Sequence, residues 1–482
     1  LLMTTLRTLF WHRRDLRMAD NLGLAKAATK TAAITGIYVL DPAIITPPYQ
    51  LPPIAPARLW FLIESLIELR HNWHKAGSRL LIVEGDPVEV LPRFARKINA
   101  ETVVWNREVE PYARKRDRQV KRQLEADGRR VLAEWDQQLI APAQIKTGSG
   151  NPYRVYGPFL RNWRTQVHAN TPCSVKAPSE LIDLDSEQQV SLPSSDLLEP
   201  LRSSHGFGAV DSCPCRPGEK AAFEQLQIFC DQQIRSYEPD RNIPSVKGTS
   251  TLSAALSIGT ISPRQAWRAA NEARKQARDQ KSQKAISVWE QELAWREFYQ
   301  QALFHFPELA LGPFRSKWRQ FPWENNNSWF KAWREGMTGI PIIDAAMRQL
   351  NQSGWMHNRC RMIVASFLVK DLICDWRWGE RAFMELEVDG DLAANNGGWQ
   401  WSASSGMDSK PLRIFNPATQ ATKFDPNANY IRLWLPELRH ISTQDLLSGN
   451  IGALERRGYP EPIVDHKCQQ AHFKALYATI NN

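Results

Sequence analysis

The chain has 482 residues, 43% hydrophobic and 23% charged, which is typical of a globular protein of two or three domains and excludes a disordered or collagen-like chain. The 61 lysines and arginines outnumber the 51 aspartates and glutamates, and the net charge of +10 favours polyanionic partners such as nucleic acid. No apolar run approaches the ~18 residues of a membrane helix, and seven cysteines argue against a disulfide framework, so we expect a cytoplasmic protein without membrane contact.

The first third of the chain alternates apolar, β-rich runs with amphipathic segments. These runs predict five strands, at residues 6–11, 32–40, 80–84, 102–106 and 131–136. Between them, Asp20 is placed to cap a helix that begins at Asn21. Pro56, Pro87 and Pro111 each occupy the first turn of a helix, where proline is tolerated. Five strand–helix units with short links predict an α/β domain with a doubly wound parallel sheet over residues 1–136.

Residues 137–236 break this pattern with scattered Pro, Gly and Ser, and predict a long connector with short helices at 156–165 and 219–234. The spacing of Cys213-Pro-Cys215 in this connector fits no common zinc motif, so we expect no metal site there.

From residue 237 to 482 the chain is predicted to form an all-α domain. Apolar residues recur at helical spacing in segments 287–304, 341–353 and 361–375, and Gly354 and Gly379 are the expected helix stops.

The common nucleotide-binding motifs are absent from the sequence. His12-Arg13-Arg14-Asp15 follows the first strand where a dinucleotide-binding protein would carry a glycine-rich turn, and no P-loop motif occurs. Lys247-Gly248-Thr249-Ser250-Thr251-Leu252-Ser253 instead places four hydroxyl groups at a helix start, where free N–H groups favour phosphate, although an ordinary capped helix has the same pattern.

Two further segments combine aromatic and charged residues. Trp289, Glu292, Trp295, Arg296 and Tyr299 share one helical face, which indicates either a ligand site or a structural ion pair. Residues 389–406 hold paired Asp, Asn and Gly, which allow tight turns and close approach of the backbone to a ligand. Two tryptophans of that segment are two residues apart and suit the stacking of a base or a flavin.

Several motifs closely resemble one family. Trp355-Met356-His357-Asn358-Arg359-Cys360-Arg361-Met362, residues 389–406 and Leu412-Arg413-Ile414-Phe415-Asn416-Pro417 are similar to the photolyase and cryptochrome flavoproteins, and most specifically to the class I cyclobutane pyrimidine dimer DNA photolyases. Phe10-Trp11-His12-Arg13-Arg14-Asp15-Leu16-Arg17 resembles the first strand of that family. The resemblance covers essentially the whole chain and is weakest at residues 47–56 and 174–217.

The resemblance implies that the helical domain binds FAD noncovalently. Carried over by motif, the residues that would hold or line FAD are Tyr237, Thr249, Ser250, Thr251, Leu252, Ser253, Trp289, Arg296, Arg361, Asp389, Gly390, Asp391 and Asn395. Arg361 would pair with Asp389 beside the isoalloxazine ring, and Asp391 would lie near the ribityl and adenine side. Asn395 would face flavin N5, where a neutral amide can hydrogen-bond N5 with or without its proton. Related cryptochromes often carry Asp or Cys at that position, so Asn395 favours repair.

The implied activity is light-driven repair of cyclobutane pyrimidine dimers in DNA, in which excited reduced FAD donates an electron to a flipped-out dimer. The residues that would contact DNA, duplex or single-stranded, are Arg241, Glu292, Trp295, Tyr299, Asn358, Arg359, Trp401, Gln420 and Lys423. Trp295 and Trp401 would clamp the dimer, Met362 would pack below it, and Glu292 would hydrogen-bond a thymine carbonyl. Trp399, Trp376 and Trp323 match the three tryptophans that pass an electron from the surface to the flavin.

Family members hold a second, light-harvesting pigment in the α/β domain, either 8-hydroxy-5-deazaflavin or methenyltetrahydrofolate. Asp41, Arg58, Glu108, Glu110 and Tyr112 follow strands or open helices, so they either surround such a pigment or form surface ion pairs. Their motifs look more like the deazaflavin-type relatives, although Ser257 stands where a pigment-binding lysine is expected.

We expect a monomer. Three alternatives to repair of cyclobutane dimers remain. A cryptochrome-type blue-light receptor would share the fold but is disfavoured by the residues expected at the lesion, which are Glu292, Trp295, Met362, Asn395 and Trp401. Repair of the (6-4) photoproduct is disfavoured by Asn358, where that group carries a histidine-containing pattern. A structural nucleic-acid-binding protein would need no flavin.

Overall fold

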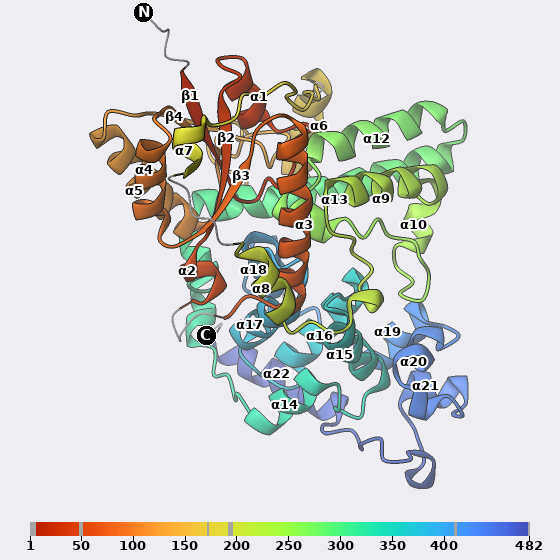
Figure 1. Ribbon diagram of the computed structural model, residues 1–482. Coiled ribbons are helices and arrows are strands. Elements are labelled where there is room, and N and C mark those ends of the chain that lie inside the picture. Colours follow the sequence, from red (N-terminus) through yellow and green to blue (C-terminus); the bar gives the residue numbers. More distant parts are fainter. Residues whose placement is uncertain (1–5, 48–51, 171–172, 191–195, 409–411, 481–482) are drawn as a thin grey trace, which may run out of the picture.

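The computed structural model describes residues 6–47, 52–170, 173–190, 196–408 and 412–480. A sheet part and a larger helical part lie against each other, with the sheet near the N-terminus in red and orange (Figure 1). Among the described residues, no helix has the length and apolar character needed to cross a membrane.

The sheet has the five predicted strands, with ends shifted by at most two residues. They are β1 (Arg7–His12), β2 (Ile34–Leu40), β3 (Leu80–Glu84), β4 (Ala100–Asn106) and β5 (Arg130–Glu134). All neighbours pair in parallel, in the order β3-β2-β1-β4-β5. Every residue of β1 is buried, because this central strand is covered on both faces. The predicted α/β fold is confirmed.

Helices connect the strands. They are α1 (Leu22–Ala28), α2 (Pro42–Ile45), α3 (Pro56–Lys75), α4 (Pro87–Lys97) and α5 (Pro111–Ala126). The prolines begin α3, α4 and α5 as predicted. The predicted cap of α1 is wrong by one residue: Asn21 accepts from the Leu24 N–H at 3.1 Å, whereas the Asp20 carboxylate accepts from Val175 N–H and pairs with Arg264.

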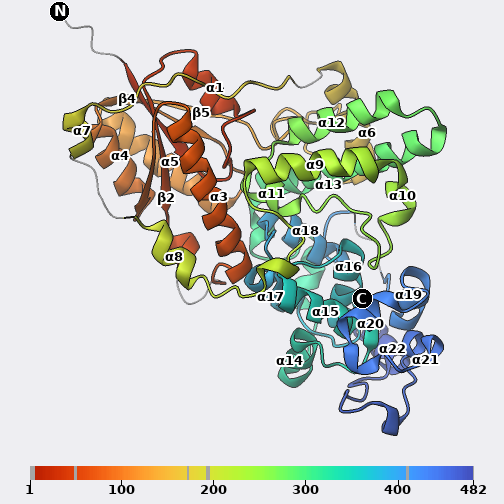
Figure 2. The same ribbon diagram turned by 45° about the vertical axis from the view of Figure 1, so that its right-hand side comes forward.

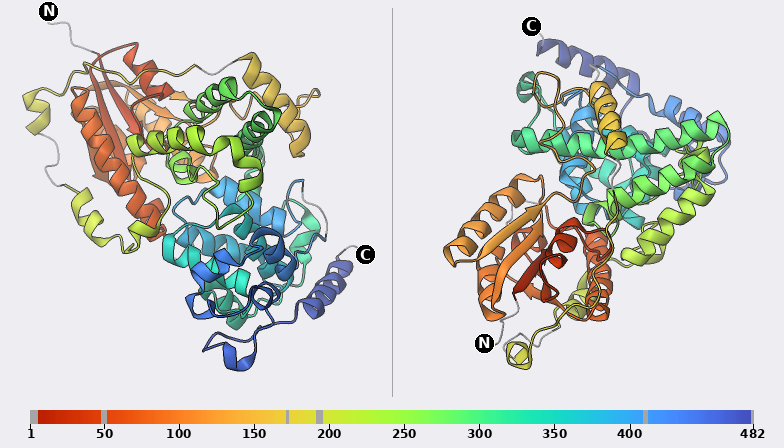
Figure 3. Two further views of the ribbon diagram at one scale, coloured as in Figure 1. Left: turned by 90° about the vertical axis from the view of Figure 1, so that its right-hand side faces the viewer. Right: turned by 90° about the horizontal axis from the view of Figure 1, so that it is seen from above.

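The remainder is helical. The helices are α6 (Tyr156–Ala169), α7 (Ser186–Val190), α8 (Leu198–Ser204), α9 (Glu219–Gln232), α10 (Tyr237–Asp240), α11 (Ser253–Ile258), α12 (Pro263–Gln276), α13 (Gln280–His305), α14 (Asn327–Glu335), α15 (Pro341–Ser353), α16 (Asn358–Lys370), α17 (Trp376–Leu386), α18 (Leu392–Ser402), α19 (Pro417–Phe424), α20 (Asn429–Trp434), α21 (Thr443–Ser448) and α22 (His466–Thr479). Short 3₁₀ turns lie at Val210–Ser212, Ile234–Ser236, Pro307–Ala310, Ser316–Gln320, Pro436–Leu438 and Ala453–Glu455. The C-terminal helix α22 lies on the side of the helical part that faces away from the sheet (Figure 3).

Two glycine-based expectations have different outcomes. Gly354 ends α15 in the left-handed conformation, at φ +67°, as predicted. Gly379 does not stop a helix but lies inside α17, where a Cβ would come within 2.1 Å of the Trp399 ring. Close packing of α17 on α18, and not a helix end, therefore requires this glycine.

The Asp, Asn and Gly-rich segment is also more regular than predicted. Asp391 caps α18 by accepting from the Ala394 N–H at 2.9 Å, so residues 392–402 form a helix and not a series of turns. At Gly397 the backbone lies close to another helix, because a Cβ there would be 2.1 Å from the Tyr299 ring of α13. Close approach of this segment to a ligand stays a prediction.

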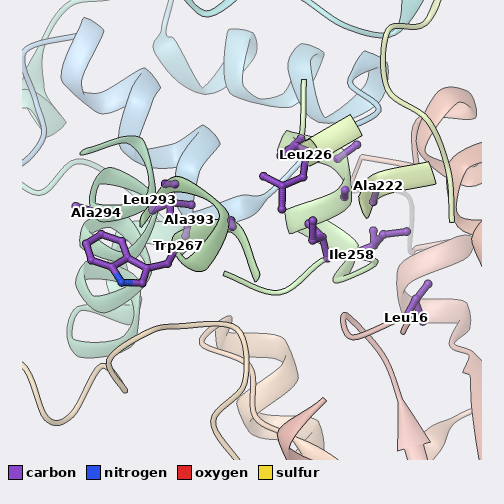
Figure 4. Packing of buried hydrophobic residues seen from close by; sticks show 14 of the residues in the cluster. Leu16, Ala222, Leu226, Ile258, Trp267, Leu293, Ala294 and Ala393 are labelled. Atoms are coloured by element: carbon purple, nitrogen blue, oxygen red, sulfur yellow. The ribbon is translucent and has the colours of Figure 1, made fainter. Parts of the chain in front are cut away.

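A hydrophobic core extends across both parts of the molecule. It includes Leu16 after β1, Leu226 of α9, Ile258 of α11, Trp267 of α12 and Leu293 of α13 (Figure 4). The Leu16 N–H donates to the Ile258 carbonyl at 3.2 Å. The connector helices α6 and α9 pack on α13 and α12 of the helical part. The division of the chain into domains at 1–136, 137–236 and 237–482 rests on the sequence pattern and stays a proposal.

Helix α3 links the two parts along its length. It packs on β3, and it also contacts α9, α11 and α17 (Figure 2). At its beginning, the Arg58 guanidinium donates to the Gly390 and Met384 carbonyls, each at 3.1 Å. The last turn of α17 and the turn before α18 are thereby fixed to the sheet part.

Candidate active site

The predicted pair of Arg361 and Asp389 is present. Arg361, on α16, donates from Nη2 to both Asp389 oxygens at 2.8 and 3.1 Å, and from Nη1 to Glu387 at 2.8 Å. Both carboxylates are almost fully buried. Burial raises the pKa of Glu387 to about 7, with Arg361 opposing that shift. The pair joins the start of α16 to the turn before α18.

Asp391 belongs to a polar seam between the two parts of the molecule. Its carboxylate pairs with Arg14, whose other nitrogens reach Glu110 at 2.6 Å and the Ser257 carbonyl at 2.7 Å. The neighbouring Arg296 donates to the Gln137 carbonyl at 2.6 Å. Arg14 was not among the predicted site residues, because its partner is 377 residues away in sequence. The role of Asp391 near the ribityl chain stays a prediction.

Asn395 is oriented by its neighbours on α17 and α18. Its Nδ2 donates to the Glu380 carbonyl at 2.9 Å, and Asn396 Nδ2 donates to the Glu380 carboxyl at 2.8 Å. Burial raises the pKa of that carboxyl to about 7. Asn395 itself is half-buried. One amide hydrogen is thus committed to the protein, and the second, with the amide oxygen, fits hydrogen bonding to a polar ring edge.

The hydroxyl-rich segment precedes α11, which starts at Ser253. The N-cap Leu252 is buried and supplies no side-chain cap, while Ser253 is exposed. Thr251 adopts a left-handed φ of +49°, and its hydroxyl accepts from Gln225 at 3.1 Å. Thr249 and Ser250 are half-buried in the same turn. These hydroxyl and N–H groups fit an anionic group.

Two predicted cofactor residues are buried in the core beside this segment. The Trp289 ring is only 3% exposed and packs on Phe229 at 5.3 Å between ring centroids. Tyr237 packs on the same Phe229 at 5.9 Å, and Arg241 covers its ring at 5.3 Å. Their roles toward FAD stay predictions.

Glu292, on α13, is paired with Arg241. Arg241 Nη1 lies 2.7 Å from Glu292 Oε1, and about a third of the Glu292 side chain is exposed. Burial raises the pKa of Glu292, and Arg241 and Arg359 oppose this effect. Glu292 thus forms an ion pair, but with Arg241 and not with Arg296 of the same helical face, which donates to backbone carbonyls. The raised pKa of Glu292 also fits a carboxyl that holds or shares a proton.

Trp295, one of the two tryptophans predicted to clamp the dimer, stacks on a residue that was not predicted. Trp295 stacks on Tyr156 of the connector, with ring centroids 3.4 Å apart and planes 7° apart, and on Tyr299 at 5.7 Å. The Tyr156 hydroxyl donates to the Gln291 carbonyl at 3.0 Å. Tyr156 was missed because nothing in the local pattern shows which face of α13 the connector covers.

Trp401, on α18, lines a small cavity. Its lining residues are Met362, Ser366, Lys370, Trp401, Ser402, Arg413 and Phe415. The Arg413 guanidinium lies 5.6 Å from the centroid of the Trp401 ring. Met362 and Trp401 are therefore brought together as predicted, whereas no close ring contact among the described residues joins Trp295 to Trp401.

The other predicted DNA contacts lie at or near the surface of α16 and α19. Asn358 and Lys423 are exposed, and Gln420 is half-buried. Arg359 donates to Asn242 at 2.5 Å and covers the Phe424 ring at 4.2 Å. These positions suit phosphate contacts, which stay predictions.

The three predicted relay tryptophans differ in exposure. Trp399 and Trp376 are each 2% exposed, whereas Trp323 is half-buried and stacks on Trp318 at 6.1 Å. Trp399 contacts Phe383 at 4.9 Å and Trp333 at 6.0 Å. No close ring contact within the described ranges joins Trp376 to the other two, so the relay stays a prediction.

The predicted antenna residues fall into two groups. Arg116, which the sequence did not single out, lies 3.0 Å from Glu108 and 3.7 Å from Asp41, and the Tyr112 hydroxyl donates to Asp41 at 2.7 Å. Arg58 and Glu110 lie instead at the seam with the helical part. The alternative of surface ion pairs is met only in part. Asp41 and Glu108 pair with Arg116 in a buried cluster, Glu110 pairs with Arg14, and Arg58 donates to backbone carbonyls. Separately, no group of three or more His, Cys, Asp or Glu side chains in the described ranges could hold a metal ion.

Comparison with known proteins assigns the family. The model described as DNA photolyase matches residues 8–178, and the model described as FAD binding domain of DNA photolyase matches residues 289–479. The deoxyribodipyrimidine photo-lyase of Synechococcus sp. is 56% identical over 470 residues, which cover 97% of this chain and 96% of that protein.

Solved structures agree with this assignment. A bacterial class III photolyase from Agrobacterium tumefaciens matches with a TM-score of 0.90 at 35% identity, covering 100% of this chain and 99% of that one. A Synechocystis cryptochrome matches with a TM-score of 0.87 at 28% identity, covering 98% and 100%. Fold and site thus define a two-part protein with a helical FAD-binding domain. The chain belongs to the DNA photolyase family.

Proposed function

We propose that this chain is a light-driven DNA photolyase that splits cyclobutane pyrimidine dimers, and that it is of class I. One observation carries the proposal. Helices α16 and α18 contact each other, and each bears one flavin-side and one lesion-side residue: Arg361 and Met362 are adjacent on α16, and Asn395 and Trp401 lie on α18. A flavin and a flipped base would therefore be neighbours.

The residues around this site have distinct tasks. Bound FAD, when reduced and excited by light, would supply an electron that opens the cyclobutane ring and would take that electron back, so repair involves no net redox change. Asp389, paired with Arg361, would lie beside the ring system, and Asn395 would offer its amide to the polar edge of that ring system. Glu292, whose pKa is raised, can donate a proton in a hydrogen bond to a thymine carbonyl as that carbonyl gains negative charge. Trp401 supplies a stacking face for the flipped dimer.

The test is repair itself. Purified protein is incubated with DNA that carries thymine dimers, in blue light and in darkness, and intact thymines are measured. We expect repair only in light, with Glu292→Ala lowering the repair yield. Equal repair in both conditions, or none with fully reduced FAD, would refute the proposal. The second outcome together with light-dependent changes in the flavin spectrum would favour the cryptochrome-type receptor, which shares the fold.

The second pigment is a separate proposal. We assign 8-hydroxy-5-deazaflavin to the α/β domain, supported by Arg58 and Glu110 at the seam and by Asp41, Glu108 and Tyr112 around Arg116. The purified holoprotein should absorb in the deazaflavin band, and Arg58→Ala should lose this band and keep FAD. The exposed Arg93→Ala of the same domain is the control. Release of folate instead would overturn the pigment choice.

We also propose that the enzyme acts as a cytoplasmic monomer on duplex or single-stranded damaged DNA. Its net charge of +10 and the exposed Lys423 on α19 support binding to a polyanion. Sedimentation of the holoprotein with and without DNA tests this oligomeric state, and we expect the mass of one chain without DNA.

A further inference from the structure

The lining of the cavity beside Trp401 includes a lysine, Lys370, that the proposed repair reaction does not explain. Met362, Ser366 and Lys370 follow one another at intervals of four along α16, so they lie on one face of the helix and line the cavity. Lys370 is the last residue of α16 and is only 2% exposed. Lysine is almost never buried to this extent unless its amino group is paired.

The Lys370 amino group is bound to backbone and not to an acid. Nζ donates to the carbonyl of Arg413, in the segment that follows α18 and precedes α19. The adjacent Asp371 carboxylate is engaged by His466 of α22 instead. In the described part of the chain, Lys370 forms no ion pair. Burial of an ammonium group without a carboxylate costs stability, so packing alone does not account for this residue.

A second hydrogen bond attaches the same segment, residues 413–415, to α16. The Phe415 N–H donates to Ser366 Oγ at 3.3 Å, one helical turn before Lys370. The 413–415 segment is thus attached to α16 at two points, by Ser366 and by Lys370. Its Arg413 side chain then lies 5.6 Å from the Trp401 ring and 5.2 Å from the Phe415 ring. Arg413 is exposed, so its guanidinium faces both the ring and the solvent.

We propose that Lys370 is a positioning residue of the lesion site: through its hydrogen bond to the Arg413 carbonyl it holds Arg413 against Trp401, and this arrangement strengthens binding of dimer-containing DNA. The inference rests on the proposed function. It assigns Lys370 no contact with DNA, FAD or the reacting bonds.

The hydrogen bond depends on the charge of Lys370. Burial lowers the pKa of Lys370 to about 7, with a further lowering by Arg413 and an opposing effect of Asp371. A charged donor makes the stronger hydrogen bond, so the anchor is firm below pH 7 and loosens as Lys370 deprotonates above it. The charged groups that face Lys370 are Arg413 and Asp371, and His466 acts through Asp371. The pKa of His466 is raised by Asp371, and its titration must be separated from that of Lys370.

The experiment measures dark binding of the FAD-loaded protein to a duplex with one thymine dimer and to the same duplex without it, between pH 6 and pH 9. The variants are Lys370→Met, which removes the donor, and Lys370→Gln, which keeps a neutral N–H donor. Both variants retain His466, so comparing each variant with the unsubstituted protein removes the contribution of His466 to the pH dependence of binding. Lys331→Met, at an exposed lysine of α14, is the matched control.

At pH 6, Lys370→Met should bind the dimer about 10-fold more weakly than the unsubstituted protein, the size expected for one hydrogen bond from a charged donor. Lys370→Gln should fall between the two. The difference from the unsubstituted protein should shrink toward pH 9 with a midpoint near pH 7, whereas any transition caused by His466 should appear in all three proteins. Lys331→Met should follow the unsubstituted protein throughout.

Thermal unfolding distinguishes positioning from a purely structural role. Because a buried charge is removed, Lys370→Met should be at least as stable as the unsubstituted protein at pH 6 while binding the lesion less well. Loss of stability in parallel with affinity in both variants, or unchanged affinity at pH 6, would overturn the role of Lys370. If the unsubstituted protein neither prefers dimer-containing DNA nor repairs it in light, the proposed function fails and this inference fails with it.

Discussion

Glu292 shows how two opposing effects set the state of one carboxyl group. Burial raises its pKa, and the Arg241 guanidinium at 2.7 Å lowers it. Removing Arg241 leaves burial opposed only by Arg359, so in Arg241→Met the protonated Glu292 should persist to higher pH than in the unsubstituted protein. The infrared carbonyl band of the acid, assigned by its loss in Glu292→Gln, measures this titration. A band that disappears at lower pH in Arg241→Met would show that Arg241 does not govern Glu292.

At the same scale, Trp323 is the most exposed of the three relay candidates. If it delivers electrons from the surface, Trp323→Phe should abolish photoreduction of oxidised FAD and spare repair by protein whose FAD was reduced chemically beforehand. The control is Trp318→Phe, because Trp318 stacks on Trp323 but is only 2% exposed. Transient absorption and a repair assay give the two rates, and loss of both in Trp323→Phe would mean that Trp323 is structural.

At the scale of elements, adjacent glycines of α18 have opposite surroundings. A Cβ on Gly397 would lie 2.1 Å from Tyr299 of α13, whereas one on Gly398 would meet nothing within 4 Å. Gly397→Ala should therefore lower the free energy of unfolding by about 1–3 kcal/mol through overpacking. Gly398→Ala should raise it by about 0.5–1 kcal/mol, since alanine favours a helix interior. Denaturant titrations of the two variants measure the contrast, which equal effects would contradict.

The elements themselves were largely predictable because their signals are local. Apolar runs gave the five strands, and Pro56, Pro87 and Pro111 marked three helix starts. The errors arose where tertiary packing determines the structure: Gly379 reads as a helix stop but makes room for Trp399. Arg361 with Asp389 was foreseen from a motif, whereas Arg14 with Asp391 and Tyr156 with Trp295 join distant segments. No local pattern encodes such pairs.

At the scale of the whole molecule, a buried ionic network supports the shared core. Arg264 of α12 contacts Asp20 at 3.1 Å and Asp136 at 2.7 Å, and Arg17 also reaches Asp136, all nearly inaccessible to solvent. Arg264→Met would leave buried carboxylates with fewer partners and should cost about 3–5 kcal/mol. Arg202→Met, which breaks an exposed pair with Glu64, should cost about 0–1 kcal/mol. Calorimetry should give one transition for both parts, and two separate transitions would contradict a shared core.

The network also gives the pH dependence of stability a definite sign. Arg17 and Arg264 hold the pKa of Asp136 below its ordinary value of 3.8 although burial opposes them. A carboxyl whose folded-state pKa is lowered stabilises the fold above its unfolded-state value and loses that contribution as the pH falls below it. Denaturant midpoints should therefore drop below about pH 4. Midpoints that stay constant down to pH 3 would show that this network does not limit acid stability.

Helix α3 has a consequence for optics. It is 20 residues long, so it spans about 30 Å as one rigid rod. Its beginning is fastened to the Met384 and Gly390 carbonyls of the helical part, while its body packs on β3. Excitation passes between two chromophores at a rate that falls steeply with their separation and depends on their mutual angle. For a pigment bound in the sheet part, helix α3 would fix both the distance and the angle to the flavin. Every molecule would then transfer absorbed energy to the flavin with the same efficiency.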